Sequence, residues 1–85
     1  MENNNYEAII EAILFTMGNS VELEKIASAI ELDTKQTKEI IEQMMEHYER
    51  PESGVKIVEL DSSYQMCTKS EMYEYLIRIA KQPKR

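Results

Sequence analysis

Cysteine, glycine, proline and tryptophan are all scarce in this chain of 85 residues, which has one cysteine, two glycines, two prolines and no tryptophan. A single cysteine cannot form an internal disulfide, so Cys67 suits a reducing cytosol, and we expect it to be a small buried hydrophobic side chain. Two glycines leave little room for a loop that cradles a phosphate. No apolar run approaches the roughly 20 residues of a membrane span, and the polar, acidic start does not resemble a signal peptide.

Basic residues are also few, and they are unevenly distributed. The chain has 16 acidic and 10 basic residues, which gives a formal net charge of −6. The first 77 residues alone carry a net charge of −10. An acidic body repels nucleic acid and anionic membranes at long range, whereas the basic tail suits nonspecific DNA contact or a linker. That tail holds Arg78, Lys81, Lys84 and Arg85.

The length predicts one domain, and a hydrophobic fraction of 42% is typical of a folded protein. Helix-forming residues predict a first helix from Tyr6 to Met17, which Gly18 ends as a C-cap. Val21 suits a very short strand. Apolar residues at spacings of three and four then predict a second helix over residues 23–30.

A third helix is predicted to begin at Asp33, because Asp33 and Gln36 have the spacing of a capping box. It ends before Pro51, since the residue before a proline disfavours helical geometry. The first and third helices each have an apolar stripe that we expect to face the core. The first stripe is Tyr6, Ile9, Ile10, Ile13, Leu14 and Met17, and the second is Ile40, Ile41, Met44, Met45 and Tyr48.

The second half of the chain has a different pattern. Residues 55–60 are rich in strand-forming types, residues 61–63 suit a turn, and residues 64–68 suit a second strand, which together predict a hairpin. A fourth helix is predicted over residues 70–81. Three helices, a two-stranded hairpin and a C-terminal helix define an α+β, mostly helical, winged helix-turn-helix fold in one domain, residues 1–85.

Two further signals mark the ends of this fourth helix. Thr68 and Glu71 have the spacing of another capping box at its start, and Pro83 ends it.

The first and fourth helices carry more apolar surface than one small core can use. The first helix has a second apolar patch nearly opposite its core stripe, and the fourth is apolar over more than half its circumference. Spare apolar surface of this kind marks protein interfaces, so we expect a homodimer. The alternative is that the fourth helix packs over the first within one chain. The expected interface residues are Ala8, Ala12, Phe15, Met72, Tyr75 and Ile79.

The third helix occupies the position of a DNA-recognition helix, but its exposed face is acidic. A helix that reads DNA needs cations towards the phosphates, and glutamates along a major groove would face them without compensation. The acidic face is interpreted either as a plain solvated surface or as a docking surface for a basic or amphipathic partner segment. The glutamates are Glu39, Glu42, Glu46 and Glu49. A dimeric transcription regulator that reads DNA through Lys35, Gln36, Lys38 and the wing is the alternative.

Catalysis is not supported by the residues present. His47 is the one histidine, and no serine or cysteine nucleophile is placed beside it by the sequence, so we expect a partly exposed structural side chain. Glu7 and Glu11 are paired at four-residue spacing on a solvated helix face, where neither is tuned as a general acid. No metal site and no cofactor is expected, and the chain is not expected to be an enzyme.

Three segments resemble the N-terminal domain of segregation and condensation protein B. AIIEAILF at residues 8–15, followed by Gly18, is similar to that family's opening helix, and VELEKIA at residues 21–27 to the start of its second helix. GVKIVE at residues 54–59 and YQMCTKSE at residues 64–71 resemble its wing and the exit from it.

This resemblance implies a chain of two winged-helix domains, of which only the N-terminal one, the dimerising domain, is present. It implies a subunit of the condensin-like complex that acts in chromosome condensation and partition and has no chemistry of its own. The implied partner is the kleisin subunit, segregation and condensation protein A, and through it the structural-maintenance-of-chromosomes ATPase. We expect a cytoplasmic, nucleoid-associated protein without strong direct binding to nucleic acid, and weak or absent kleisin binding by this domain alone.

Overall fold

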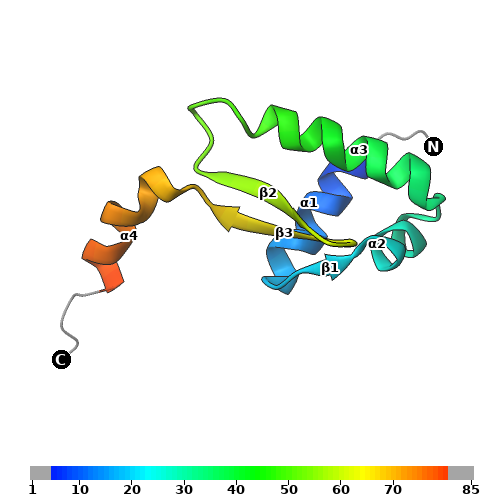
Figure 1. Ribbon diagram of the computed structural model, residues 1–85, viewed down its shortest axis with the longest axis horizontal. Coiled ribbons are helices and arrows are strands. Elements are labelled where there is room, and N and C mark those ends of the chain that lie inside the picture. The colour runs from blue at the N-terminus through cyan, green and yellow to red at the C-terminus, as the bar shows by residue number, and fades with distance from the viewer. Residues whose placement is uncertain (1–4, 81–85) are drawn as a thin grey trace.

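The computed structural model describes residues 5–80, which form helices and one small sheet (Figure 1). The elements are α1 (Tyr6–Met17), β1 (Val21–Glu22), α2 (Leu23–Ile30), α3 (Thr34–His47), β2 (Val55–Leu60), β3 (Ser63–Thr68), a 3₁₀ turn η1 (Ser70–Met72) and α4 (Tyr73–Ala80).

Two of the predicted helix ends are confirmed. Gly18 ends α1 in the left-handed conformation, with φ of 73°, and its N–H donates to the Leu14 carbonyl over 3.2 Å. At the start of α3 the Asp33 carboxylate accepts from the Gln36 N–H over 2.7 Å. Each cap satisfies a backbone group that the helix leaves without a partner.

The sheet has three antiparallel strands in the order β1-β3-β2. β2 and β3 form the predicted hairpin, in register from Val55 opposite Thr68 to Leu60 opposite Ser63. The predicted short strand at Val21 is present, and it pairs with Tyr64 on the free edge of β3. The wing is therefore joined by a third strand, because β1 uses backbone groups of β3 that an isolated hairpin would leave unpaired.

The core lies between the sheet and the first three helices. Ile10 and Leu14 of α1 are fully buried, and together with side chains from α2, α3, β2 and β3 they form one cluster. Two residues expected on the core stripe of α1 are exposed, Ile9 at 43% and Met17 at 57%. The neighbouring elements cover only the strip centred on Ile10 and Leu14. Cys67 is partly buried rather than buried.

The start of the fourth helix differs from the prediction. Lys69 occupies the cap position and no side chain caps it, so the expected box between Thr68 and Glu71 is not formed. The chain first makes the turn η1, in which the Met72 N–H donates to the Lys69 carbonyl over 2.9 Å. The predicted last residue of the helix, Lys81, lies outside the described residues, as do Pro83 and the rest of the basic tail after Arg78.

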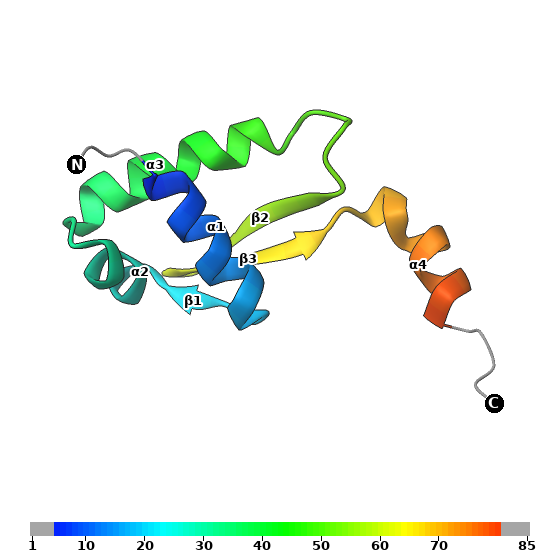
Figure 2. The same ribbon diagram turned by 180° about the vertical axis from the view of Figure 1, so that it is seen from behind.

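α4 points away from the rest of the molecule, as both views show (Figures 1 and 2). None of its residues is buried. The radius of gyration is 14.8 Å, whereas a compact chain of this length has about 12 Å. The alternative in which α4 packs over α1 of its own chain is therefore wrong for this structure.

Candidate interaction surfaces

The residues expected at a dimer interface lie on two separate apolar surfaces. On α1, Phe15 is 77% exposed, and Ala8 and Ala12 beside it are exposed. On α4, Tyr75 is 54% and Ile79 is 71% exposed. One chain does not bring these two surfaces together, so neither covers the other.

Met72, the remaining expected interface residue, is partly buried in η1. Its side chain lies close to Gly54, where an added Cβ would be 3.8 Å from the Met72 Cγ. Met72 therefore contacts the body of its own chain, and it belongs to the junction between the hairpin and α4.

The apolar surface of α1 continues into a groove beside the wing. This α1–wing groove has a volume of about 290 Å³ and is lined by Ala8, Glu11, Ala12, Phe15, Val55 and Met66. Our sequence reasoning did not include Val55 and Met66. The sequence signal that could have identified them is the two-residue period of the strands, which places Val55 with Ile57 and Met66 with Tyr64 on one face of the sheet.

The acidic surface is present on α3, although it is shorter than expected. Glu39, Glu42 and Glu46 are exposed and line a shallow depression of about 330 Å³. Glu49 is exposed too, but α3 ends at His47, so Glu49 lies in the turn beyond the helix. Tyr48 still has a helical conformation and packs against the core, and beyond it the Glu49 N–H donates to the Glu46 carbonyl over 3.1 Å in a tighter turn.

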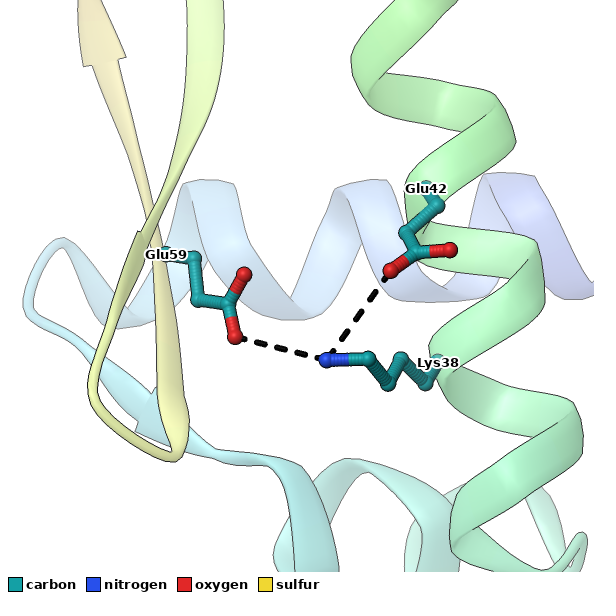
Figure 3. A network of polar contacts seen from close by, with 3 residues as sticks. All are labelled: Lys38, Glu42 and Glu59. Carbon is teal, nitrogen blue, oxygen red and sulfur yellow. Dashed lines mark hydrogen bonds and ion pairs between the residues drawn. The ribbon is translucent and has the colours of Figure 1, made fainter.

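Lys38 is held by carboxylates of its own chain (Figure 3). Its ammonium lies 3.4 Å from a Glu59 carboxylate oxygen on β2 and 3.8 Å from one of Glu42 on α3. The Tyr64 hydroxyl and then the Glu59 carboxylate raise the pKa of Lys38, so it stays charged. Because two acids compensate that charge, Lys38 is poorly suited to a phosphate contact, which weakens the DNA-binding alternative that also named Lys35 and Gln36.

Glu7 and Glu11, the pair expected on a solvated face of α1, are half-exposed and exposed respectively, and both also contact the end of α3. The Tyr48 hydroxyl donates to a Glu11 carboxylate oxygen over 2.7 Å. The His47 Nδ1 lies 3.7 Å from a carboxylate oxygen of Glu7. Burial and then the hydrogen bond to Glu11 raise the pKa of Tyr48 to about 12.

The His47 ring is 65% exposed. It lies at the wall of a depression of about 580 Å³ between the start of α1 and the end of α3. Among residues 5–80, no group of three or more histidine, cysteine, aspartate or glutamate side chains is placed to hold a metal ion. Within the same range, every helix is too short or too polar to cross a membrane.

The fold and its surfaces together define a class of protein. It is a winged-helix domain in which α3, the helix in the position of a recognition helix, is acidic, and in which α1 and α4 expose apolar surfaces. A family model for the segregation and condensation complex subunit ScpB matches residues 8–85, and the chain belongs to that family.

Relatives named segregation and condensation protein B are similar over nearly the whole chain. The one from Agathobacter rectalis is 60% identical over 82 residues, which are 95% of this chain and 44% of the relative. The one from Lachnoclostridium phytofermentans is 55% identical over 85 residues, 100% of this chain and 45% of the relative. The chain therefore spans about half the length of these relatives.

Two solved structures are similar in fold. One is a crystal structure of a dimer of an ScpB N-terminal domain complexed with an ScpA peptide; it is 34% identical, with a TM-score of 0.81 over 85% of this chain and 90% of that one. The other is ScpB from Mycobacterium tuberculosis, with a TM-score of 0.86 over 100% of this chain and 56% of that one; at 17% identity it supports the fold alone. The winged-helix prediction is confirmed.

Proposed function

We propose that this chain is a homodimerising, non-catalytic subunit of the condensin-like complex that condenses and partitions chromosomes. The observation that carries the proposal is the exposed apolar surface on α1 and α4, with Phe15 at 77% and Ile79 at 71% exposure. Each Å² of apolar surface left in water costs about 25 cal/mol, so a second copy that covers both surfaces gains free energy. The related domain that crystallised as a dimer supports this reading.

The proposed partner is the kleisin ScpA, which bridges the heads of the structural-maintenance-of-chromosomes ATPase. The sequence alone led us to expect weak or absent binding by this domain. The related N-terminal domain in complex with an ScpA peptide supports a docking surface within this part of the protein instead. We propose the acidic surface, Glu39, Glu42, Glu46 and Glu49, as the face that meets a basic or amphipathic segment of the kleisin.

The remaining expectations fit this role. The chain is proposed to be the N-terminal domain of a two-domain protein, with a second winged-helix domain beyond α4. It would act in the cytoplasm and associate with the nucleoid through the kleisin and the ATPase. Little affinity for duplex DNA is expected, because the charge of Lys38 is compensated by Glu42 and Glu59.

A binding titration with the central region of the kleisin tests the proposal. The double variant Glu39→Gln/Glu46→Gln removes two charges from the acidic surface and leaves the Lys38 contacts in place. We expect it to bind several-fold more weakly at low salt, with a difference that shrinks as salt screens the charges. Glu24→Gln changes an exposed glutamate on α2 and serves as the matched control.

Each result has a separate meaning. If the double variant and the control bind the kleisin with equal affinity, the docking face does not lie on α3, but the subunit assignment stands. Failure of the unmodified chain to bind at all would contradict the assignment, as would binding to duplex DNA that weakens steeply with salt.

A further inference from the structure

The acidic surface of α3 continues onto the wing. Glu42 lines the depression on α3 together with Glu39 and Glu46. The same Glu42 also faces the Lys38 ammonium, which lies between it and Glu59 of β2 (Figure 3). The pair of carboxylates at Glu42 and Glu59 therefore links the proposed docking surface to the wing, and Lys38 occupies the space between them.

Lys38 is held loosely in this position. Its ammonium lies 3.4 Å from the Glu59 oxygen and 3.8 Å from the Glu42 oxygen, whereas charge-assisted hydrogen bonds between nitrogen and oxygen are about 2.7–2.9 Å long. The side chains of Lys38, Glu42 and Glu59 are 44%, 56% and 43% exposed. Ion pairs as exposed as these contribute little to stability, because water and salt screen them. Lys38 can therefore leave both carboxylates without unfolding the chain.

A buried hydroxyl beside Lys38 is also left unsatisfied. Tyr64 of β3 is 1% exposed, and its hydroxyl is near enough to Lys38 to raise the pKa of that lysine. Within residues 5–80, however, this hydroxyl has no hydrogen-bond partner of good geometry. A buried polar group without a partner is unfavourable. Lys38 thus fills the site incompletely, since both carboxylates lie at long range and the hydroxyl behind them is unpaired.

The charge of Lys38 opposes the partner proposed for this surface. A basic segment that docks on α3 is repelled by Lys38 as long as Lys38 stays in place. Displacement removes the repulsion and keeps the carboxylates paired, because the incoming cation takes over Glu42 and Glu59. The released ammonium is strongly hydrated and sits on a flexible four-carbon stem, so it turns into water readily.

We propose that Lys38 is a built-in counter-ion of the docking surface, and that a basic side chain of the kleisin segment displaces it from Glu42 and Glu59. The displacement rests on the proposed function, since it requires the kleisin to bind on α3. It adds Glu59 of the wing to the docking surface and gives Lys38 an autoinhibitory role. It also favours segments that carry a basic side chain at this place.

A titration with the central region of the kleisin tests the role of Lys38. We expect Lys38→Gln to lower the dissociation constant about three- to tenfold. Lys35→Gln removes the same charge from an exposed position one turn earlier on α3, and it is expected to lower the constant by less than about twofold. When Glu42→Gln/Glu59→Gln is present as well, Lys38→Gln should gain no more than Lys35→Gln does.

Zero-length cross-linking follows the displacement directly. A carbodiimide joins an ammonium to a carboxylate only where the two are in contact. In the free chain we expect a bond between Lys38 and Glu59, identified by mass spectrometry of the digested chain, because the two lie 3.4 Å apart. Its yield should fall several-fold when the kleisin segment is saturating. A segment whose basic residues are changed to glutamine is the control and should leave the yield unchanged.

Two results would overturn the displacement while the subunit assignment stands. One is a gain in affinity for Lys38→Gln that does not exceed the gain for Lys35→Gln. The other is a cross-link between Lys38 and Glu59 that forms undiminished in the saturated complex. If the unmodified chain does not bind the kleisin segment at all, the proposed function and the displacement fail together.

Discussion

Two residues other than glycine hold a left-handed backbone conformation within residues 5–80: Glu31, with φ of 62°, and Asp61, with φ of 61°. Glu31 lies at the C-terminal end of α2. Its conformation lets the Leu32 N–H donate to the Ala27 carbonyl over 3.1 Å, so that Leu32 folds back and packs against the core. The apolar Leu32 after the helix is the signal for this cap, because a hydrophobic contact frequently accompanies such an ending.

The strain at Glu31 predicts that glycine is better at this position. Glu31→Gly should raise the free energy of unfolding by about 0.5–1 kcal/mol, because glycine adopts positive φ without a steric penalty. Urea unfolding at a fixed chain concentration measures it. Ser28→Gly, three residues earlier within α2, is the control and should destabilise by about 0.5 kcal/mol. Destabilisation by both variants would show that the conformation at Glu31 carries no strain.

The hydrogen bond from Tyr48 to Glu11 predicts a pH dependence. The pKa of Tyr48 is raised from its ordinary value of 10.0 to about 12 in the folded chain, so deprotonation favours the unfolded state. The stability that Tyr48 contributes is complete below pH 10 and is lost as the pH rises through 12. Tyr48→Phe should cost about 1 kcal/mol at pH 8. Between pH 8 and 11 it should lose less stability than the unmodified chain.

Urea unfolding at the two pH values measures the effect of Tyr48. Tyr73→Phe, on exposed α4, is the matched control and should behave as the unmodified chain does. Equal losses between pH 8 and 11 for the unmodified chain and Tyr48→Phe would contradict the raised pKa.

At the scale of elements, the sequence predicted a helix end correctly where that end depends only on residues close to it in the chain. Gly18 and the pair Asp33 and Gln36 marked helix ends correctly, because a cap depends on residues within one turn. The pair Thr68 and Glu71 had the same spacing but did not form a cap. There the backbone of Lys69 is held by Gly54, a contact from a distant part of the chain that spacing cannot reveal.

α2 and α4 offer a direct comparison, since each has eight residues. α2 buries Ile26, Ala27 and Ile30, whereas α4 buries nothing in its own chain. We expect amide hydrogen exchange in α4 to slow as the chain concentration rises, because dimerisation covers it, while exchange in α2 remains unchanged. Protection of α4 that is independent of concentration would mean that α4 needs no second copy.

At the scale of the whole molecule, sequence patterns identified the fold but not how its elements cross. Glu7 and Glu11 lie on α1 between the core stripe and the second apolar patch, a position that predicts solvent. The end of α3 passes over that position and brings His47 and Tyr48 to the two carboxylates. A helical wheel describes one helix at a time, so it cannot predict which neighbour covers its edge. The excess of apolar surface was visible in the wheel, but the direction of α4 was not.

The central claim is that a second copy covers the apolar surfaces of α1 and α4, and light scattering of the purified chain at micromolar concentration tests it most directly. The account predicts a mass of about twice the 10.0 kDa of one chain. It also predicts that Ile79→Gln shifts the mass towards one chain, whereas Lys25→Gln, at an exposed residue of α2, does not. A mass of 10.0 kDa for the unmodified chain at that concentration would contradict the account.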